Sequence, residues 1–173
     1  EMTSSLVGSE MCIRDRLDTG SMLMIAEFDP VHPERLISEP KCLSRPLYGF
    51  ENTEHTINNE GPYAFYYHNK IYLAYSGGDA RGYLYAIGML TANDGDDLCD
   101  LSVWEKAKTP IASFATIPGE YGPGHNSFFW DRDQNLWIAY HAVTSFEEKI
   151  VSSGMRRVYF EQDKTPRFDV IVE

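Results

Sequence analysis

The chain has 173 residues, which is enough for one domain with a substantial core, and its 11 Tyr and 9 Phe favour β-strands over helix bundles. Its formal net charge of −11 argues against nucleic acid or an anionic membrane as a partner and leaves neutral ligands compatible. No run of about 18 apolar residues occurs, so no membrane span is predicted.

The three cysteines, Cys12, Cys42 and Cys99, have no metal-type spacing, and their odd number excludes a fully paired disulfide framework within one chain. Residues 1–16 show no strand alternation and no recognisable signal peptide. Within them, residues 8–16 resemble adaptor read-through at the ends of translated metagenomic assemblies. We therefore interpret residues 1–16 as a non-native leader and residues 17–173 as native sequence that begins in mid-domain. Both secretion and a cytoplasmic location remain open.

The first predicted strand covers residues 22–28 (MLMIAEF), and Asp29-Pro30 ends it. The polar segment that follows, residues 31–58, is rich in Pro and Glu and predicts one short strand and a long connection. Two complete units come next, and no amphipathic helix longer than one or two turns is expected. Their predicted strands lie near residues 62–67, 71–76 and 83–90, and near residues 126–130, 136–141 and 156–161.

The two complete units repeat one another about 65 residues apart. Residues 60–65 (EGPYAF) and 71–76 (IYLAYS) correspond to residues 124–129 (GHNSFF) and 136–141 (LWIAYH). A period of this size, built from short aromatic strands, is typical of propeller blades. With the outer half of a preceding blade near residues 22–29, the pattern predicts an all-β fold of about two and a half blades, which do not close a ring.

Glu60 and His125 stand at the same end of the two repeats. Because the innermost strands of successive blades converge on one axis, both side chains are expected to face one central cleft. Pro62 fits the first position of a strand, and Gly61 allows a close approach of the backbone. A carboxyl placed there is partly shielded from water, as suits a general acid. The alternative is a loop carboxylate in water.

His125 follows a rigid Gly-Pro-Gly turn and could bind a metal, orient a carboxylate or form hydrogen bonds inside a polar core. His141 closes the partner strand and is expected to be structural. Arg156 and Arg157 open the last predicted strand, and alternation turns one of them inward. An inward arginine would pair with a carboxylate or donate to sugar hydroxyls, whereas two outward arginines would be rim charges.

Several of these motifs, in this order and spacing, closely resemble glycoside hydrolase family 43. They are residues 59–62 (NEGP), 74–76 (AYS), 122–128 (GPGHNSF) and 136–142 (LWIAYHA), and the resemblance extends roughly over residues 17–170. It implies a five-bladed β-propeller that cleaves arabinose- or xylose-containing plant polysaccharides or oligosaccharides. It also implies inversion at the anomeric carbon with three acidic residues.

The resemblance assigns the general acid to Glu60. It implies that His125 binds substrate or is associated with a calcium ion near the propeller axis, and that Arg156 binds substrate near the floor of the site, with Arg157 as the alternative. No organic cofactor is implied. Nothing upstream of Glu60 matches the family's general base or its pKa-modulating aspartate. We therefore expect a C-terminal fragment of the enzyme that lacks the base and is inactive alone.

Two other interpretations remain open at this stage. The chain could be a non-catalytic propeller module that binds carbohydrate or protein, or a secreted scaffold stabilised by calcium. An aspartate in each of the first two inner strands upstream would indicate an enzyme rather than a binding module. The choice between arabinose and xylose, and between exo and endo action, depends on loops at the cleft rim and is not predicted.

Overall fold

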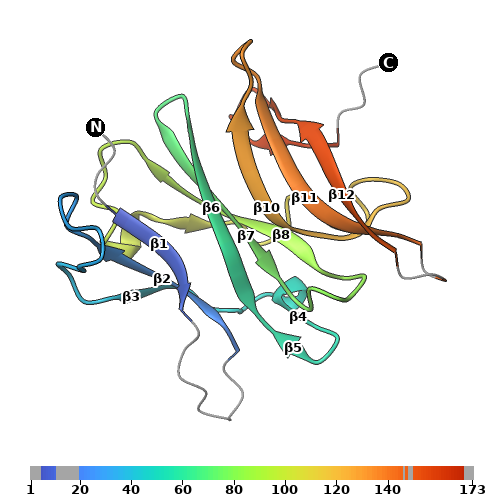
Figure 1. Cartoon of the computed structure of the whole chain (residues 1–173), viewed down its shortest axis with the longest axis horizontal. Helices are drawn as coiled ribbons and strands as arrows, with labels where there is room; N and C mark the ends of the chain where they lie inside the picture. Colours follow the sequence, from blue (N-terminus) through green and yellow to red (C-terminus); the bar gives the residue numbers. More distant parts are fainter. Residues whose placement is uncertain (1–4, 11–19, 146, 148–149, 170–173) are drawn as a thin grey trace.

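The computed structural model describes residues 5–10, 20–145, 147 and 150–169. Their strands form three antiparallel sheets that fan out next to one another, together with two short ribbons (Figure 1). Within these residues there is no α-helix, only two single-turn 3₁₀ helices. This is the all-β architecture that the aromatic strand pattern predicted.

The three sheets correspond to successive blades. The first has the order β1-β2-β3, the second β6-β7-β8-β9 and the third β10-β11-β12. Their strands are β1 (Ser5–Glu10), β2 (Met22–Glu27), β3 (Lys41–Ser44), β6 (Asn59–Tyr67), β7 (Lys70–Gly77), β8 (Ala86–Asn93), β9 (Glu105–Lys106), β10 (Tyr121–Trp130), β11 (Leu136–Ser145) and β12 (Ile150–Arg157). The ribbons and 3₁₀ helices are β4 (Asn52–Thr53), β5 (Thr56–Ile57), β13 (Tyr159–Phe160), β14 (Pro166–Arg167), η1 (Gly49–Glu51) and η2 (Leu101–Val103).

The third strand of the second sheet begins later than the sequence predicted. Residues 80–84 form a turn, and β8 starts at Ala86 instead of Tyr83. The turn is held by Glu54, which accepts a hydrogen bond from the Tyr83 backbone N–H (3.3 Å) and lies so close to Gly82 that a Cβ there would collide with its carboxylate. Alternation of apolar residues cannot reveal such a contact. The shift matters because it places Tyr85 at the entrance of the strand.

Two other strands also differ from expectation. β12 covers residues 150–157, where a strand over residues 156–161 was predicted, because its pairing with β11 begins at Ile150. β1 lies in the segment interpreted as a leader and pairs with β2, although its sequence does not alternate. Backbone hydrogen bonds to an open strand edge require no alternation. The proposed non-native origin of residues 1–16 stays a prediction, and residues 1–4 and 11–16 lie outside the described residues.

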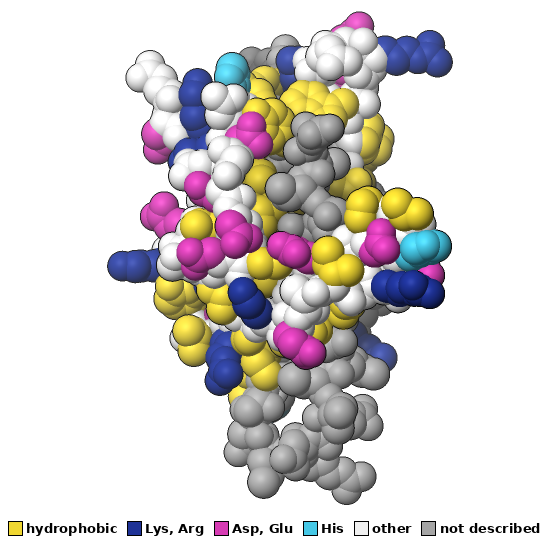
Figure 2. Space-filling model, turned by 90° about the vertical axis from the view of Figure 1, so that its left-hand side faces the viewer, with side chains coloured by type: hydrophobic (Ala, Val, Ile, Leu, Met, Phe, Trp, Pro, Cys, Tyr) yellow, Lys and Arg dark blue, Asp and Glu magenta, His cyan; other side chains and the backbone are white. Residues whose placement is uncertain are grey.

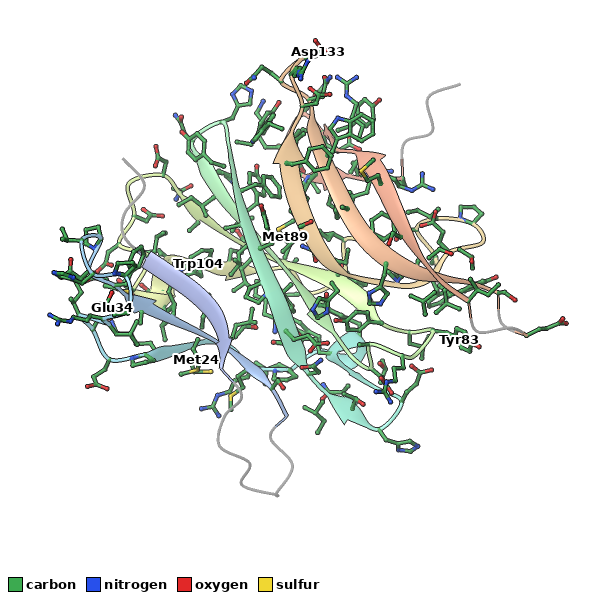
Figure 3. The ribbon with its side chains drawn as sticks, in the orientation of Figure 1. Met24, Glu34, Tyr83, Met89, Trp104 and Asp133 are labelled. Carbon is green, nitrogen blue, oxygen red and sulfur yellow. The ribbon has the colours of Figure 1, made fainter. Side chains whose placement is uncertain are left out.

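The main hydrophobic core lies between the second and third sheets. Phe65 stacks on Tyr72 with ring centroids 4.9 Å apart and contacts Phe128 at 4.5 Å. Figure 3 shows Met89 within this core and Trp104 beside a smaller cluster that joins the first and second sheets. Because β7 is buried from Tyr72 to Gly77, the second sheet is packed on both faces. The two cores therefore fix the ends of β6 and β10 relative to each other.

Charged and apolar side chains are interspersed on one face of the molecule. The face in Figure 2 carries acidic, basic and apolar side chains in a mixed pattern without a continuous basic area. Over the described ranges, no helix has the length and apolar character needed to cross a bilayer.

Candidate active site

The two repeated strands, β6 and β10, carry the same irregularity at the same place. Pairing of β6 with β7 shifts between Glu60 and Tyr63, and pairing of β10 with β11 shifts on both sides of Gly124. A bulge turns a side chain away from the regular alternation and is common at functional sites. Gly61 (φ 57°) and His125 (φ 51°) both have left-handed backbones there. For histidine this conformation is uncommon, so the surrounding contacts must hold it.

A buried tyrosine joins the two predicted site residues. The Tyr85 hydroxyl donates a hydrogen bond to Glu60 Oε1 (2.7 Å) and lies 3.2 Å from His125 Nδ1. Glu60 is partly buried and His125 is exposed, whereas Tyr85 is fully buried. Burial raises the pKa of Tyr85 far above its ordinary value, so the hydroxyl keeps its proton at neutral pH. The structure thus places the Glu60 carboxyl and the His125 imidazole beside one another, as expected.

A second group of contacts fixes these side chains. The Ser76 hydroxyl accepts a hydrogen bond from the His125 backbone N–H (2.8 Å). The His141 ring stacks on Tyr85, with centroids 5.5 Å apart and planes 8° from parallel. Burial, assisted by the nearby His125, lowers the pKa of His141. His141, which is partly buried, therefore packs against the tyrosine that joins Glu60 and His125, and the structural role predicted for it stays a prediction.

Glycine makes room for the Tyr85 ring. A Cβ built on Gly124 would lie 2.1 Å from the Tyr85 ring, which no side chain tolerates. The Gly-Pro-Gly turn before His125 thus serves packing as well as turn geometry.

A buried carboxylate anchors the residue before Glu60. Glu51 is completely buried and accepts hydrogen bonds from the Tyr75 hydroxyl (2.7 Å) and the Asn59 side-chain amide (2.9 Å). It also accepts hydrogen bonds from two backbone N–H groups, and its ion-pair partner is Lys106 (2.5 Å). Asn59, also fully buried, accepts a hydrogen bond from the Ser44 hydroxyl at 2.8 Å. Because Asn59 directly precedes Glu60, this network fixes the start of the strand that presents the acid.

Arg156 occupies a different place from the one expected. It lies on β12, the outer strand of the third sheet, and donates to Glu120 (2.9 Å) and to the Tyr140 hydroxyl (2.9 Å). Burial raises the pKa of Tyr140 to about 12. Arg157 donates to Asn135 and lies over the Tyr159 ring. The structure therefore brings neither arginine to Glu60 or His125, because Glu120 and Asn135 bind them on the outer strands.

A hollow of about 440 Å³ opens beside the site. It is lined by residues of the β7–β8 loop and of β11 and β12, and Ala80 of that loop forms a backbone hydrogen bond with His141. The charged residues in its wall are Glu54, Asp79 and Arg81. In Figure 3, Tyr83 of the same wall lies at the opposite end of the molecule from Asp133, which marks the tip of the β10–β11 hairpin.

The described residues near His125 do not make a calcium site by themselves. Calcium takes about six to eight oxygen ligands, whereas the side chains in contact here are an imidazole, a phenol and a carboxylate already bonded to that phenol. In the described part of the chain, the one group of three metal-ligating side chains lies elsewhere, at Glu27, Asp97 and Cys99. No step of the chemistry is therefore derived through calcium.

Sequence reasoning missed three residues of this site. Tyr85 lay inside a strand assigned to the outer part of the blade, Ser76 was noted only as part of a repeat, and Glu51 lay in a segment interpreted as a connection. The residues around Tyr85 gave no signal for it, because Gly82 and Gly88 lie against Glu54 and Tyr75; the glycine that leaves room for Tyr85 is Gly124, on another strand.

The fold is that of part of a β-propeller, and a partly buried carboxyl held by a buried phenol stands at the entrance of one of its strands. The family model of glycosyl hydrolases family 43 matches residues 13–166. The chain belongs to this family.

Relatives whose activity is named are arabinofuranosidases. The chain is 29% identical over 163 residues to an extracellular exo-α-(1→5)-L-arabinofuranosidase of Streptomyces avermitilis, covering 90% of this chain and 33% of that protein. It is 34% identical over 126 residues to the enzyme of the same description from Streptomyces chartreusis, covering 72% of this chain and 37% of that protein. The chain thus spans about a third of the length of these relatives.

Solved structures share the fold. An α-L-arabinofuranosidase from Lactobacillus brevis superimposes with a TM-score of 0.82 at 29% identity, covering 95% of this chain and 51% of that one. A xylan β-1,4-xylosidase from Bacillus halodurans reaches 0.70 at 13% identity, covering 95% and 30%, and shows the fold alone. The all-β fold, as part of a family-43 propeller, is therefore confirmed.

Proposed function

We propose that this chain carries the general-acid half of a glycosidase that cleaves arabinose- or xylose-containing polysaccharides or oligosaccharides with inversion. The observation that carries the proposal is the position of Glu60, partly buried, bonded to Tyr85 and beside His125. The names of the relatives, exo-α-(1→5)-L-arabinofuranosidases, support arabinose as the sugar released.

In this mechanism Glu60 protonates the oxygen of the departing sugar. A second carboxylate, roughly 6.5–9.5 Å away, activates water on the opposite face of the ring. Four carboxylates near the site have other partners: Glu51 pairs with Lys106, Glu54 accepts from the β7–β8 turn, Asp79 accepts from the Arg81 backbone N–H, and Glu120 pairs with Arg156. We assign none of them as base, and we propose that the base belongs to sequence outside this chain.

The remaining groups bind the sugar. His125 is exposed next to Glu60 and can exchange hydrogen bonds with sugar hydroxyls. The hollow lined by Glu54, Asp79 and Arg81 offers charged acceptors and a donor to further hydroxyls. Arg156 is not included, since its guanidinium is bound by Glu120 and Tyr140.

The test uses both this chain and a longer protein that contains it. We expect the 173-residue chain to bind arabino-oligosaccharides but not to hydrolyse an aryl arabinofuranoside or xyloside. Turnover by the purified chain would contradict the missing base. In the longer protein, Glu60→Gln should lower kcat on natural linkages by about 10²–10⁴-fold.

A matched substrate separates acid catalysis from misfolding. An activated aryl glycoside has a leaving group that needs little protonation, so Glu60→Gln should slow its cleavage much less than that of a natural linkage. Equal loss on both substrates would argue against Glu60 as the general acid.

The absence of an assigned base among the described residues also keeps the binding-module interpretation in view. Oligosaccharide binding by the longer protein, with no hydrolysis of any arabinoside or xyloside, would favour it.

A calcium ion at the propeller axis stays a prediction. Metal analysis of the wild type and of His125→Ala checks whether the ion is bound. A structural ion must also raise the melting temperature of the protein that binds it.

A further inference from the structure

Tyr85 has one hydroxyl proton and two partners that could each accept it. Glu60 Oε1 lies 2.7 Å away and His125 Nδ1 lies 3.2 Å away. Because the phenol is fully buried, its hydroxyl has no bulk water to turn to. The direction of each hydrogen bond is therefore constrained by the chemistry of the partners.

An ionised carboxylate only accepts hydrogen bonds, so the contact with Glu60 must use the Tyr85 proton. The Tyr85 oxygen then faces His125 Nδ1 with a lone pair. A bare Nδ1 would place two lone pairs against each other at 3.2 Å, whereas a protonated Nδ1 donates a hydrogen bond. The Ser76 hydroxyl oxygen accepts a hydrogen bond from the His125 backbone N–H (2.8 Å), so this contact involves the backbone of His125 and leaves the protonation of its ring to the Tyr85 contact.

We propose that Tyr85 is a positioning residue that holds neutral His125 in the Nδ1–H tautomer while Glu60 is ionised. The consequence is that His125 Nε2 carries a free lone pair. While Glu60 is ionised, His125 Nε2 therefore accepts a hydrogen bond from a sugar hydroxyl and does not donate one. This role rests on the proposed function, since it assigns to His125 one direction of hydrogen bonding with the substrate.

The packing of Tyr85 makes it suited to this task. Its ring packs against Gly124, where no Cβ fits, and against the parallel ring of His141, which is paired with Gly124 across β10 and β11. The hydroxyl therefore cannot swing away from Glu60 and His125. Replacing Tyr85 by Phe removes only the hydroxyl and leaves this packing in place.

The experiment is ¹⁵N NMR of the histidine side chains in the 173-residue chain without sugar. In alkaline buffer, carboxylic acids and imidazoles are both deprotonated, so the tautomer is read directly from the two ring nitrogens. His125→Asn identifies the His125 signals. We expect Nδ1–H in the wild type, and loss of this preference in Tyr85→Phe.

A second variant keeps the test decisive if Tyr85→Phe does not fold. Glu60→Ala removes the acceptor, which frees the Tyr85 proton to turn to His125 Nδ1; His125 should then change to the Nε2–H form with Tyr85 intact. Tyr72→Phe is the matched control, because it removes another buried phenol hydrogen bond in the same sheet, 2.8 Å to the Lys164 carbonyl, outside the contacts of Glu60 and His125, and should leave His125 unchanged.

Several results would overturn the proposal. They are an Nε2–H tautomer in the wild type, an unchanged tautomer in a folded Tyr85→Phe, or an unchanged tautomer in Glu60→Ala. The measurement involves no turnover, so failure of the glycosidase assignment and failure of the Tyr85 assignment are separate outcomes.

Discussion

Replacing Lys106 by Met tests the buried network that anchors the acid-bearing strand. The Lys106 side chain is 15% exposed and lies 2.5 Å from Glu51, which is completely buried. Burial lowers the pKa of Lys106, since the protein removes the ammonium from water. The Met side chain keeps the apolar stem of Lys106 and removes its ammonium group, together with the hydrogen bonds that this group donates to the Arg45 carbonyl (2.7 Å) and Asn59 Oδ1 (3.4 Å).

The expected cost follows from what remains around Glu51. Removing one partner of a buried ion pair costs about 3–5 kcal/mol, because the other charge stays buried. Glu51 keeps four donors: the Leu47 and Tyr48 N–H groups, Asn59 and Tyr75. We therefore expect the lower end, about 3 kcal/mol, and for a chain of this length a fall in melting temperature of roughly 6–12 °C.

Urea denaturation of the wild type and the variant measures this difference. Lys108→Met is the control, because Lys108 is exposed two residues away and its replacement should change stability by less than about 0.5 kcal/mol. The double variant Glu51→Gln/Lys106→Met should cost less than the sum of the single variants, since the two side chains share one interaction. A Lys106→Met effect no larger than the control would refute the reasoning.

Three further variants test other parts of the structure. Arg156→Met should destabilise the chain by about 1–3 kcal/mol, since Glu120 and Tyr140 lose the guanidinium that donates to both and Glu120 keeps only the hydrogen bond from the Tyr140 hydroxyl, yet it should leave arabino-oligosaccharide affinity unchanged in calorimetry. A loss of affinity without a loss of stability would restore Arg156 as a substrate ligand. Gly124→Ala should destabilise by about 1–3 kcal/mol through collision with Tyr85, seen as a lower urea midpoint, and a neutral effect would contradict the packing. Hydrogen bonds from Trp137 and Asn135 lower the pKa of Asp131 to about 2 from the model-compound value of 3.8, so its stabilisation is present above pH 3.8 and lost as the pH falls toward 2. The difference in free energy of unfolding between the wild type and Asp131→Ala should therefore become smaller over that pH range in acid-unfolding titrations. A difference that stays constant would argue against the lowered pKa of Asp131.

Local patterns in the chain were enough to predict the all-β class, the two repeated hairpins and the shared position of Glu60 and His125. Strand alternation and turn residues can be read within about ten residues along the chain, and the equivalence of the repeats follows from comparing two such segments about 65 residues apart. The same patterns misplaced the start of β8 and the extent of β12, because Glu54 and β11 set those limits from other parts of the sequence.

The partners of the site were decided only when the sheets packed together. Tyr85 meets Glu60 across 25 residues and His125 across 40, and Arg156 meets Glu120 across 36. A hydrogen bond of this kind depends on where the two side chains end in space, and nothing in the residue types states that a phenol will reach one carboxyl or a guanidinium another. The chain thus encodes its strands and the placement of its acid locally, whereas the groups that surround that acid follow from the packing of one blade against the next.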